Sequence, residues 1–307
     1  MSPLALRVSL PESDLRDALG AIDGVEFVHW PMDGPAPFPE IDLVVTPYMG
    51  AANRVAHLAG VDTRLVQSQS IGYDGIDQLL PAGHVFANAT TVHETSTAEL
   101  TLALILASQR GLPDFVRAAD RGEWAPAHHP SLADRTVLLV GYGGVGAAIE
   151  SRLLAFETTV IRVARTARSD ARGEIHALDK LPELLPQADI VVIGVPLNES
   201  TTHLVDDAFL SLMRDGALLV NIARGPVADT DALLAHASSG RLRLALDVTD
   251  PEPLPHGHPL FALPNVLISP HVGGASSAMR PRMVRLIRDQ IERMQRGDTP
   301  VNVVLQS

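Results

Sequence analysis

The sequence predicts an α/β protein with two doubly wound domains, Rossmann-like or flavodoxin-like, and a cleft between them. Three observations predict this fold. Short apolar runs alternate with amphipathic segments, a glycine-rich turn joins one apolar run to a helix, and the length of 307 residues suffices for two domains. Such alternation is typical of a parallel sheet covered by helices, and one domain usually needs about 100–200 residues.

The first third of the chain contains enough elements for one small α/β domain. A helix candidate, Glu12–Ile22, follows the first strand candidate, and the Pro-rich stretch Pro31–Pro39 is expected to be a loop. The strand candidates are Leu4–Leu10, Val25–Trp30, Leu43–Thr46, Arg64–Gln67 and His84–Ala87.

The rest of the chain predicts a second sheet. A long helix is expected over Thr95–Arg110, and a connector rich in Pro and His over Gly122–Pro130. The last helix, Ser276–Arg296, ends at Gly297, and a short apolar tail, Val301–Leu305, follows. The strand candidates of this series are Thr136–Val140, Thr158–Val163, Ile190–Val195, Ala217–Ile222, Arg243–Asp247 and Val266–Ser269.

Composition excludes several classes of protein. The chain is 46% hydrophobic and 20% charged, as in a compact globular enzyme, and its net charge is −12. An acidic surface repels phosphate backbones, so we expect no nucleic-acid partner. The absence of cysteine excludes disulfides and thiol catalysis. Met1–Leu10 has no secretion signal pattern and Leu100–Ala107 is too short to span a bilayer, so a soluble, cytoplasmic protein is expected.

The glycine turn Gly141-Tyr142-Gly143-Gly144-Val145-Gly146 indicates a dinucleotide site. The predicted strand Thr136–Val140 leads into it, and an amphipathic helix, Val145–Phe156, leaves it. The first glycine permits the tight turn, the second lets the backbone approach a pyrophosphate, and the third lets helix and strand pack closely. The helix N-terminus offers free N–H groups to the phosphates. The alternative is a plain strand-to-helix turn.

The end of the next strand selects the cofactor. In NAD sites an acid about 20 residues past the turn bonds the ribose 2′-hydroxyl. Here Ala164 occupies that place and Arg165-Thr166 follow, with Arg162 and Arg168 close by. An arginine without a competing carboxylate can pair with a 2′-phosphate. We therefore expect NADP(H) in preference to NAD(H). The alternative is that these arginines form a solvated face.

Polar or glycine residues repeatedly follow the predicted strands of the second series. In chain order they are Gly141, Arg165, Pro196, Arg224, Asp247 and His271. Ligands of an open parallel sheet bind beyond the carboxyl ends of the strands. We therefore expect these residues to meet at one edge of the sheet.

Arg224, Glu252 and His271 form a chemically sensible catalytic set. Histidine can deliver the proton that reduction of a carbonyl needs, and a neighbouring carboxylate would stabilise the imidazolium. A guanidinium can clamp a substrate carboxylate and polarise the adjacent carbonyl. Taken singly, each residue has an alternative: a surface ion pair, a solvated turn residue or a loop histidine.

At this point the chain resembles the D-isomer-specific 2-hydroxyacid dehydrogenases, which include glyoxylate/hydroxypyruvate reductases. The matching stretches are 140–146, 220–226, 245–248 with 251–254, and 269–274, and the stretch 71–77 is similar to the family's substrate loop. The sequence departs from the NAD-type pattern at Ala164, and family members that prefer NADP have an arginine and a hydroxyl residue there, like Arg165-Thr166.

The resemblance implies roles for individual residues. His271 would be the acid/base, Glu252 its partner and Arg224 the substrate anchor. Backbone N–H groups of Ile71, Gly72 and Tyr73 would hold the substrate carboxylate. The cofactor would contact Tyr142, Gly143, Gly144, Val145, Arg165, Thr166, Val195, Pro196, Ile222, Ala223, Asp247 and Gly273.

The resemblance also implies a domain organisation and an assembly. A discontinuous substrate domain would comprise residues 1–98 and 284–307, and the dinucleotide domain residues 99–283. The active site would lie in the cleft. The protein would be a homodimer, paired partly through Thr95–Arg110, that reduces a small 2-ketoacid to the D-2-hydroxyacid.

Two alternatives concern other classes of function. The family fold also serves as a nucleotide-sensing corepressor module with little turnover, which intact Arg224, Glu252 and His271 do not exclude. The histidine pairs His128-His129 and His256-x-His258 invite a metal interpretation, but no HExxH motif or cysteine accompanies them, so no metal is expected. The identity of the 2-ketoacid and the direction of flux stay open at this level.

Overall fold

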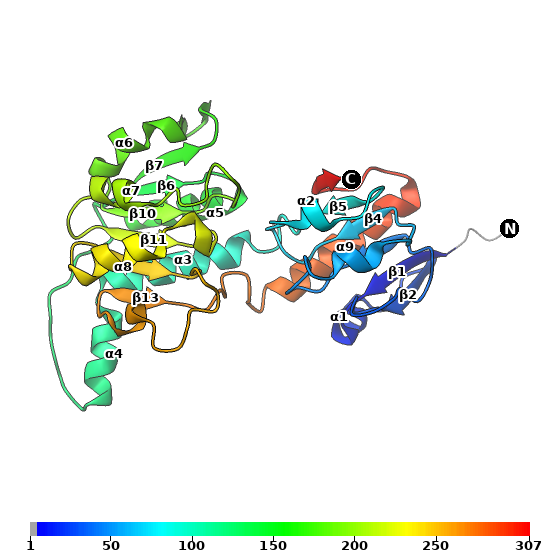
Figure 1. The fold of residues 1–307 in the computed structure, drawn as a ribbon, viewed down its shortest axis with the longest axis horizontal. Helices are drawn as coiled ribbons and strands as arrows, with labels where there is room; N and C mark the ends of the chain where they lie inside the picture. The colour runs from blue at the N-terminus through cyan, green and yellow to red at the C-terminus, as the bar shows by residue number, and fades with distance from the viewer. Residues whose placement is uncertain (1–4) are drawn as a thin grey trace. The chain divides into compact units, whose positions relative to one another are not determined.

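A computed structural model describes residues 5–307 (Figure 1). The chain forms two compact units. The discontinuous unit comprises Met1–His93 with Ser276–Ser307, and the continuous unit comprises Glu94–Ala275. Each unit is a mostly parallel sheet covered by helices, so the predicted α/β class is confirmed.

The discontinuous unit is built on a six-stranded sheet in the order β14-β5-β4-β3-β1-β2. Four of the five predicted strands are confirmed, with ends that differ by one or two residues. The remaining one, predicted over Leu4–Leu10, is confirmed over Leu6–Leu10. Its predicted first residue, Leu4, lies outside the described residues. The predicted apolar tail forms an edge strand antiparallel to β5, whereas the other pairings are parallel. The elements are β1 (Leu6–Leu10), α1 (Ser13–Leu19), β2 (Val25–His29), β3 (Leu43–Val45), β4 (Leu65–Gln67), α2 (Ile76–Leu79), β5 (Val85–Ala87), α9 (Met279–Arg296) and β14 (Val303–Gln306).

Helix α9 returns the chain to this unit because one of its faces is apolar. Met283, Ile287 and Ile291 are buried at successive turns against the core of β1, β3 and β4. Spacing of three to four residues between apolar positions produces such a face. Gly297, with φ of 76°, ends the helix in the left-handed conformation that glycine tolerates.

The continuous unit contains an eight-stranded sheet in the order β13-β12-β11-β10-β6-β7-β9-β8. All pairings are parallel except that of β8 with β9. The strands are β6 (Thr136–Val140), β7 (Thr159–Ala164), β8 (Arg168–Asp170), β9 (Gly173–Ala177), β10 (Ile190–Ile193), β11 (Leu218–Asn221), β12 (Arg243–Leu246) and β13 (Val266–Ile268).

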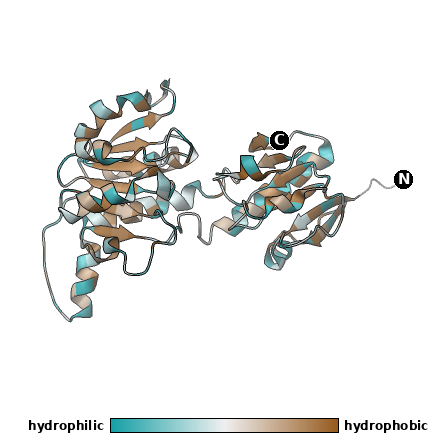
Figure 2. Cartoon of the chain, in the orientation of Figure 1, coloured by the Kyte–Doolittle hydropathy of each residue, from teal (hydrophilic) through white to brown (hydrophobic). Residues whose placement is uncertain are grey.

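Helices cover both faces of this sheet (Figures 1 and 2). Successive strand residues point to opposite faces, so Leu139 packs toward α3 and α5 while Leu138 packs toward α6, α7 and α8. Burial on both faces explains why the strands are continuous apolar runs. The helices are α3 (Glu94–Gln109), α4 (Leu112–Asp120), α5 (Gly144–Leu153), α6 (Leu181–Leu184), α7 (Asp207–Leu212) and α8 (Thr230–Ser238).

The sequence patterns missed three elements of the continuous unit: β8, β9 and α4. The hairpin β8–β9 has a fully exposed first strand, so it shows no apolar alternation. Helix α4 buries only Ala118 among its residues. The predicted domain boundaries, near residues 98 and 284, fall inside α3 and α9. Short 3₁₀ turns complete the described part of the chain at Val55–Leu58, Leu154–Phe156, Leu178–Lys180, Leu185–Gln187, Gly225–Val227 and Pro259–Ala262.

Candidate active site

The glycine turn joins β6 to α5 as the sequence predicts, and two of its glycines are sterically required. Gly141 has a φ of 109°, and a Cβ there would lie 2.5 Å from the carbonyl of Gly194. A Cβ on Gly146 would lie 2.4 Å from the carbonyl oxygen of Gly141. These contacts exclude any larger residue. The Gly194 N–H donates to the Val140 carbonyl at 2.8 Å, which holds Gly194 beside the turn.

The second glycine of the turn, Gly143, has open space beside it. A Cβ on Gly143 would meet no atom within 4 Å, and Gly143 precedes α5 in extended conformation without a side-chain cap. The first N–H groups of a helix have no partner within it. An open backbone beside uncapped N–H groups fits the pyrophosphate of a dinucleotide. Tyr142, Gly143, Gly144 and Val145 lie at this turn, and their contact with a cofactor phosphate stays a prediction.

The end of β7 carries the residues that face the ribose in this fold. Ala164 ends the strand and is buried, while Arg165 and Thr166 are exposed. Within residues 5–307, the Arg165 side chain forms no hydrogen bond or ion pair. Arg162 is different, because its side chain is only 3% exposed and its Nη1 donates to Asp170 at 2.9 Å. The guanidinium of Arg162 is therefore not available to a cofactor.

The turn after β11 positions Arg224. The buried side chain of Asn221 accepts a hydrogen bond from the Ala223 N–H at 3.1 Å and donates to the Arg224 carbonyl at 3.2 Å. Arg224 is half-buried, and its Nη1 donates to the Ala223 carbonyl at 2.7 Å. These bonds fix the backbone from which the guanidinium extends. The sequence analysis gave Asn221 no role, although this residue lies inside the matching stretch 220–226.

Asp247 braces the loop that carries His271. Its carboxylate, 3% exposed, accepts hydrogen bonds from the Ser269 hydroxyl at 2.6 Å and from the N–H groups of Val272 and Gly273 at 3.0 and 2.9 Å. The His271 N–H donates to the Asp247 carbonyl at 2.7 Å. Both carboxylate oxygens are therefore engaged by this loop. Ser269 is a further residue that sequence reasoning missed.

His271 and Glu252 form a direct pair. Nδ1 of His271 lies 2.5 Å from Oε1 of Glu252, and about a third of the histidine side chain is exposed. A bond from Nδ1–H to the carboxylate fixes the tautomer and leaves Nε2 to exchange a proton. The arrangement can therefore deliver or accept a proton at an accessible edge.

The parallel register brings the predicted residues to one edge of the sheet. Strands β6, β7, β10, β11, β12 and β13 run parallel. The candidate residues follow their carboxyl ends as predicted: Gly141, Arg165, Val195, Pro196, Ile222, Ala223, Arg224, Asp247, His271 and Gly273.

The predicted substrate loop lies in the discontinuous unit, between β4 and α2. The carbonyl of Ile71 accepts a hydrogen bond from the Asn88 side chain at 2.9 Å. Gly72 follows, and Tyr73 is 37% exposed. Tyr48 stacks on the buried His93 with ring centroids 5.5 Å apart, and His93 Nε2 lies 2.6 Å from the Gln69 carbonyl. These bonds hold the loop at the carboxyl end of β4.

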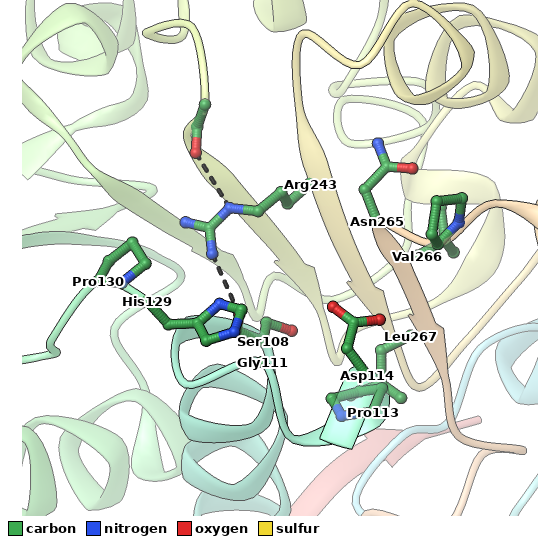
Figure 3. Close-up of a pocket in the computed structure, with 12 residues that line it drawn as sticks. Ser108, Gly111, Pro113, Asp114, His129, Pro130, Arg243, Asn265, Val266 and Leu267 are labelled. Atoms are coloured by element: carbon green, nitrogen blue, oxygen red, sulfur yellow. Dashed lines mark hydrogen bonds between the residues drawn. The ribbon is translucent and has the colours of Figure 1, made fainter. Parts of the chain in front are cut away.

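A pocket of about 350 Å³ lies at the opposite, amino-terminal edge of the large sheet. Figure 3 shows Arg243, the first residue of β12, donating to the carbonyls of Gly216 at 3.1 Å and Ser108 at 3.3 Å. Burial lowers the pKa of Arg243, and the neighbouring Arg135 lowers it further. The hydrogen bonds of Arg243 join the end of α3 to the sheet. The pocket is separate from the edge that carries His271.

Between residues 5 and 307, no three or more His, Asp or Glu side chains are grouped to hold a metal ion. His129 instead packs edge-on against Phe115, with centroids 5.2 Å apart. None of the described helices combines the length and apolarity that crossing a bilayer requires.

The fold and the glycine turn are those of a dinucleotide-binding protein, and comparison with known proteins identifies its family. Residues 102–273 match the model of the D-isomer specific 2-hydroxyacid dehydrogenase NAD binding domain. The chain is 34% identical to the glyoxylate reductase of Pyrococcus horikoshii, over 86% of this chain and 83% of that protein. It is 31% identical to human glyoxylate reductase/hydroxypyruvate reductase, over 92% of each.

A solved structure supports the same family assignment. The D-isomer specific 2-hydroxyacid dehydrogenase from Xanthobacter autotrophicus, in complex with NADPH and MES, is similar with a TM-score of 0.82 and 28% identity, over 99% of this chain and 98% of that one. The chain belongs to the D-isomer specific 2-hydroxyacid dehydrogenase family. It is an NAD(P)-dependent 2-ketoacid reductase.

Proposed function

We propose that the protein reduces a small 2-ketoacid of the glyoxylate or hydroxypyruvate type to the D-2-hydroxyacid, with NADPH as reductant. The observation that carries this proposal is the pair of His271 and Glu252, 2.5 Å apart, at the same sheet edge as Arg224 and the glycine turn. The names of relatives support the substrate class, because they include glyoxylate reductases and a glyoxylate reductase/hydroxypyruvate reductase.

Each residue has a proposed task. Arg224 binds the substrate carboxylate and polarises the ketone, and the N–H groups of Ile71, Gly72 and Tyr73 hold that carboxylate as well. The bound nicotinamide supplies the hydride. Nε2 of His271 delivers the proton to the carbonyl oxygen, and Glu252 stabilises the resulting charge on the ring. Asp247 keeps the His271 loop in place.

The preference for NADPH is supported by the end of β7. No carboxylate follows Ala164, and Arg165 is exposed and forms no ion pair with any residue from 5 to 307. An NADPH-dependent glyoxylate/hydroxypyruvate reductase of Sinorhizobium meliloti, solved with NADP and sulfate, is 25% identical with a TM-score of 0.83, over 97% of this chain and 98% of that one. Thr166 is proposed to assist Arg165 with its hydroxyl.

The proposal is tested by steady-state assays of glyoxylate, hydroxypyruvate and pyruvate with NADPH and with NADH. We expect turnover on the order of 1–10³ s⁻¹ with at least one of these acids. We expect kcat/KM to be about tenfold or more higher with NADPH, the ratio that one charge-assisted contact provides. Absence of turnover would reject the enzyme function, and a preference for NADH would reject only the cofactor assignment.

Replacement of Arg224 by glutamine should raise the KM for the ketoacid and also lower kcat. The combined loss in kcat/KM should be on the order of 10²–10³-fold, because the guanidinium contacts both the carboxylate and the carbonyl oxygen. Arg224→Lys should recover only part of it, since lysine lacks the two-point fork. Arg214→Gln, at an exposed arginine of the same unit, is the matched control. An unchanged KM in Arg224→Gln would contradict the assignment.

We also propose a homodimer. Support comes from α4, which leaves Leu112 and Val116 about half exposed, and from Trp124 in the following connector, which is 96% exposed. Exposed large apolar side chains are frequent at protein interfaces. The cytoplasmic location and the substrate-binding role of the discontinuous unit stay predictions.

A further inference from the structure

Helix α5 carries a buried acid that the proposed chemistry does not use. Glu150 is 4% exposed, two turns into the helix that begins at the glycine turn. The Tyr142 hydroxyl donates to its Oε2, and Nη1 of Arg172 donates to the same oxygen at 2.5 Å. A buried carboxylate is costly unless it is paired. Glu150 therefore joins the glycine turn to the hairpin β8–β9.

The same cluster neutralises two arginines. Arg162 Nε lies 3.7 Å from Oε1 of Glu150, and its Nη1 donates to both oxygens of Asp170 at 2.9 and 3.1 Å. Asp170 also accepts from the Arg172 N–H at 2.8 Å. Two carboxylates thus balance two guanidiniums. The uncompensated positive charge beyond β7 belongs to the two remaining arginines, Arg165 and Arg168.

Arg168 is tied to the glycine turn. Its Nη2 donates to the Tyr142 carbonyl at 2.8 Å and its Nη1 to the Thr166 carbonyl at 3.4 Å. Neither partner is an acid, so the guanidinium keeps its full charge. Its position depends on the backbone of Tyr142, and the side chain of Tyr142 is held by Glu150.

The pKa shifts of residues in this cluster agree with close contacts between them. Burial and the bond to Glu150 raise the pKa of Tyr142, so its hydroxyl stays a donor at neutral pH. The bond to Glu150 raises the pKa of Arg172, and the bonds from Arg172 and Arg162 hold the pKa of Asp170 below its usual value. These shifts favour the charged forms of Arg172 and Asp170 and the protonated hydroxyl of Tyr142.

We propose that Glu150 is a positioning residue for recognition of the cofactor's 2′-phosphate. By bonding Tyr142 and Arg172 together it fixes the hairpin against the glycine turn, and this fixes where Arg165 and Arg168 present their charge. This inference rests on the proposed use of NADP(H). It assigns to a buried residue of the helix a role in cofactor selection.

The test is calorimetric titration of the full chain with adenosine 2′,5′-bisphosphate and with adenosine 5′-monophosphate. These probes differ by the 2′-phosphate alone. Glu150→Gln should weaken binding of the bisphosphate on the order of tenfold, the loss of one charge-assisted contact, and leave the monophosphate within about twofold. With NADPH in the assay, KM should rise while kcat at saturation is retained. Glu183→Gln, which removes an exposed pair with Lys180, is the matched control. Arg165→Ala is the positive control.

The outcomes separate the two proposals. If the wild type binds both probes equally, the preference for NADP(H) is wrong and there is no 2′-phosphate site to position. If the wild type prefers the bisphosphate and Glu150→Gln keeps that preference, or weakens both probes alike, only the role of Glu150 is rejected. Should Glu150→Gln not fold, Arg172→Met decides. It removes a half-exposed partner, and an unchanged preference there overturns the inference.

Discussion

Replacing His271 with alanine is expected to lower kcat by about 10²–10⁴-fold, the usual contribution of a positioned general acid. The reason is geometric. Nδ1 of His271 is held by Glu252 at 2.5 Å, so Nε2 is the group that can protonate the carbonyl oxygen. Binding of NADPH should change by less than about twofold, because the imidazole donates no structural hydrogen bond to the glycine turn. Stopped-flow reduction and cofactor titration measure the two effects separately.

A matched control lies in the loop next to Glu252. His256 is exposed, so His256→Ala should retain wild-type kcat. Glu252→Gln should show a smaller loss than His271→Ala, because the histidine keeps a hydrogen-bond partner but loses the stabilising charge. Wild-type turnover in His271→Ala would reject the assignment of the proton donor.

The second large effect is expected from Gly225→Ala. A Cβ at this position would lie 1.9 Å from the carbonyl oxygen of Thr249 and 2.2 Å from its carbon, distances that no packing can accommodate. Either the turn with Arg224 or the segment leading to Glu252 must therefore move. We expect a loss of unfolding free energy of about 1–3 kcal/mol. We also expect kcat/KM to fall about 10²-fold, because a shift near 1 Å misaligns reacting groups.

Denaturant unfolding and steady-state kinetics measure these two effects. Gly34→Ala is the control, because a Cβ there meets no atom within 4 Å. If Gly225→Ala had the stability and kcat/KM of the wild type, the close approach of Gly225 to Thr249 would be important for neither stability nor catalysis.

Much of the site could be predicted from the sequence because its signals are local. The strand before Gly141 and the helix after it are adjacent in the chain, so their periodicity and spacing are visible without a structure. Arg224 and His271 could be expected at one sheet edge because parallel strands align their carboxyl ends. The absence of an acid at position 164 can also be seen in the sequence, by counting residues from the glycine turn.

Other features depend on contacts between distant segments. The first strand of the hairpin β8–β9 is polar and exposed, and ion pairs among Arg162, Asp170 and Glu150 hold it where apolar alternation is missing. The sequence places Arg162 and Arg165 three residues apart and cannot distinguish them. Packing buries Arg162 in the ion-pair cluster and leaves Arg165 exposed.

The sequence by itself determined the α/β class, the dinucleotide turn and the identity of the three candidate catalytic residues, because these follow from periodicity and short motifs. Only the tertiary structure decided which groups meet. It brought Nδ1 of His271 to Glu252, both oxygens of Asp247 to the His271 loop, and Gly225 against Thr249. The physical reason is that hydrogen bonds and close packing act over a few ångströms in space, whatever the separation along the chain.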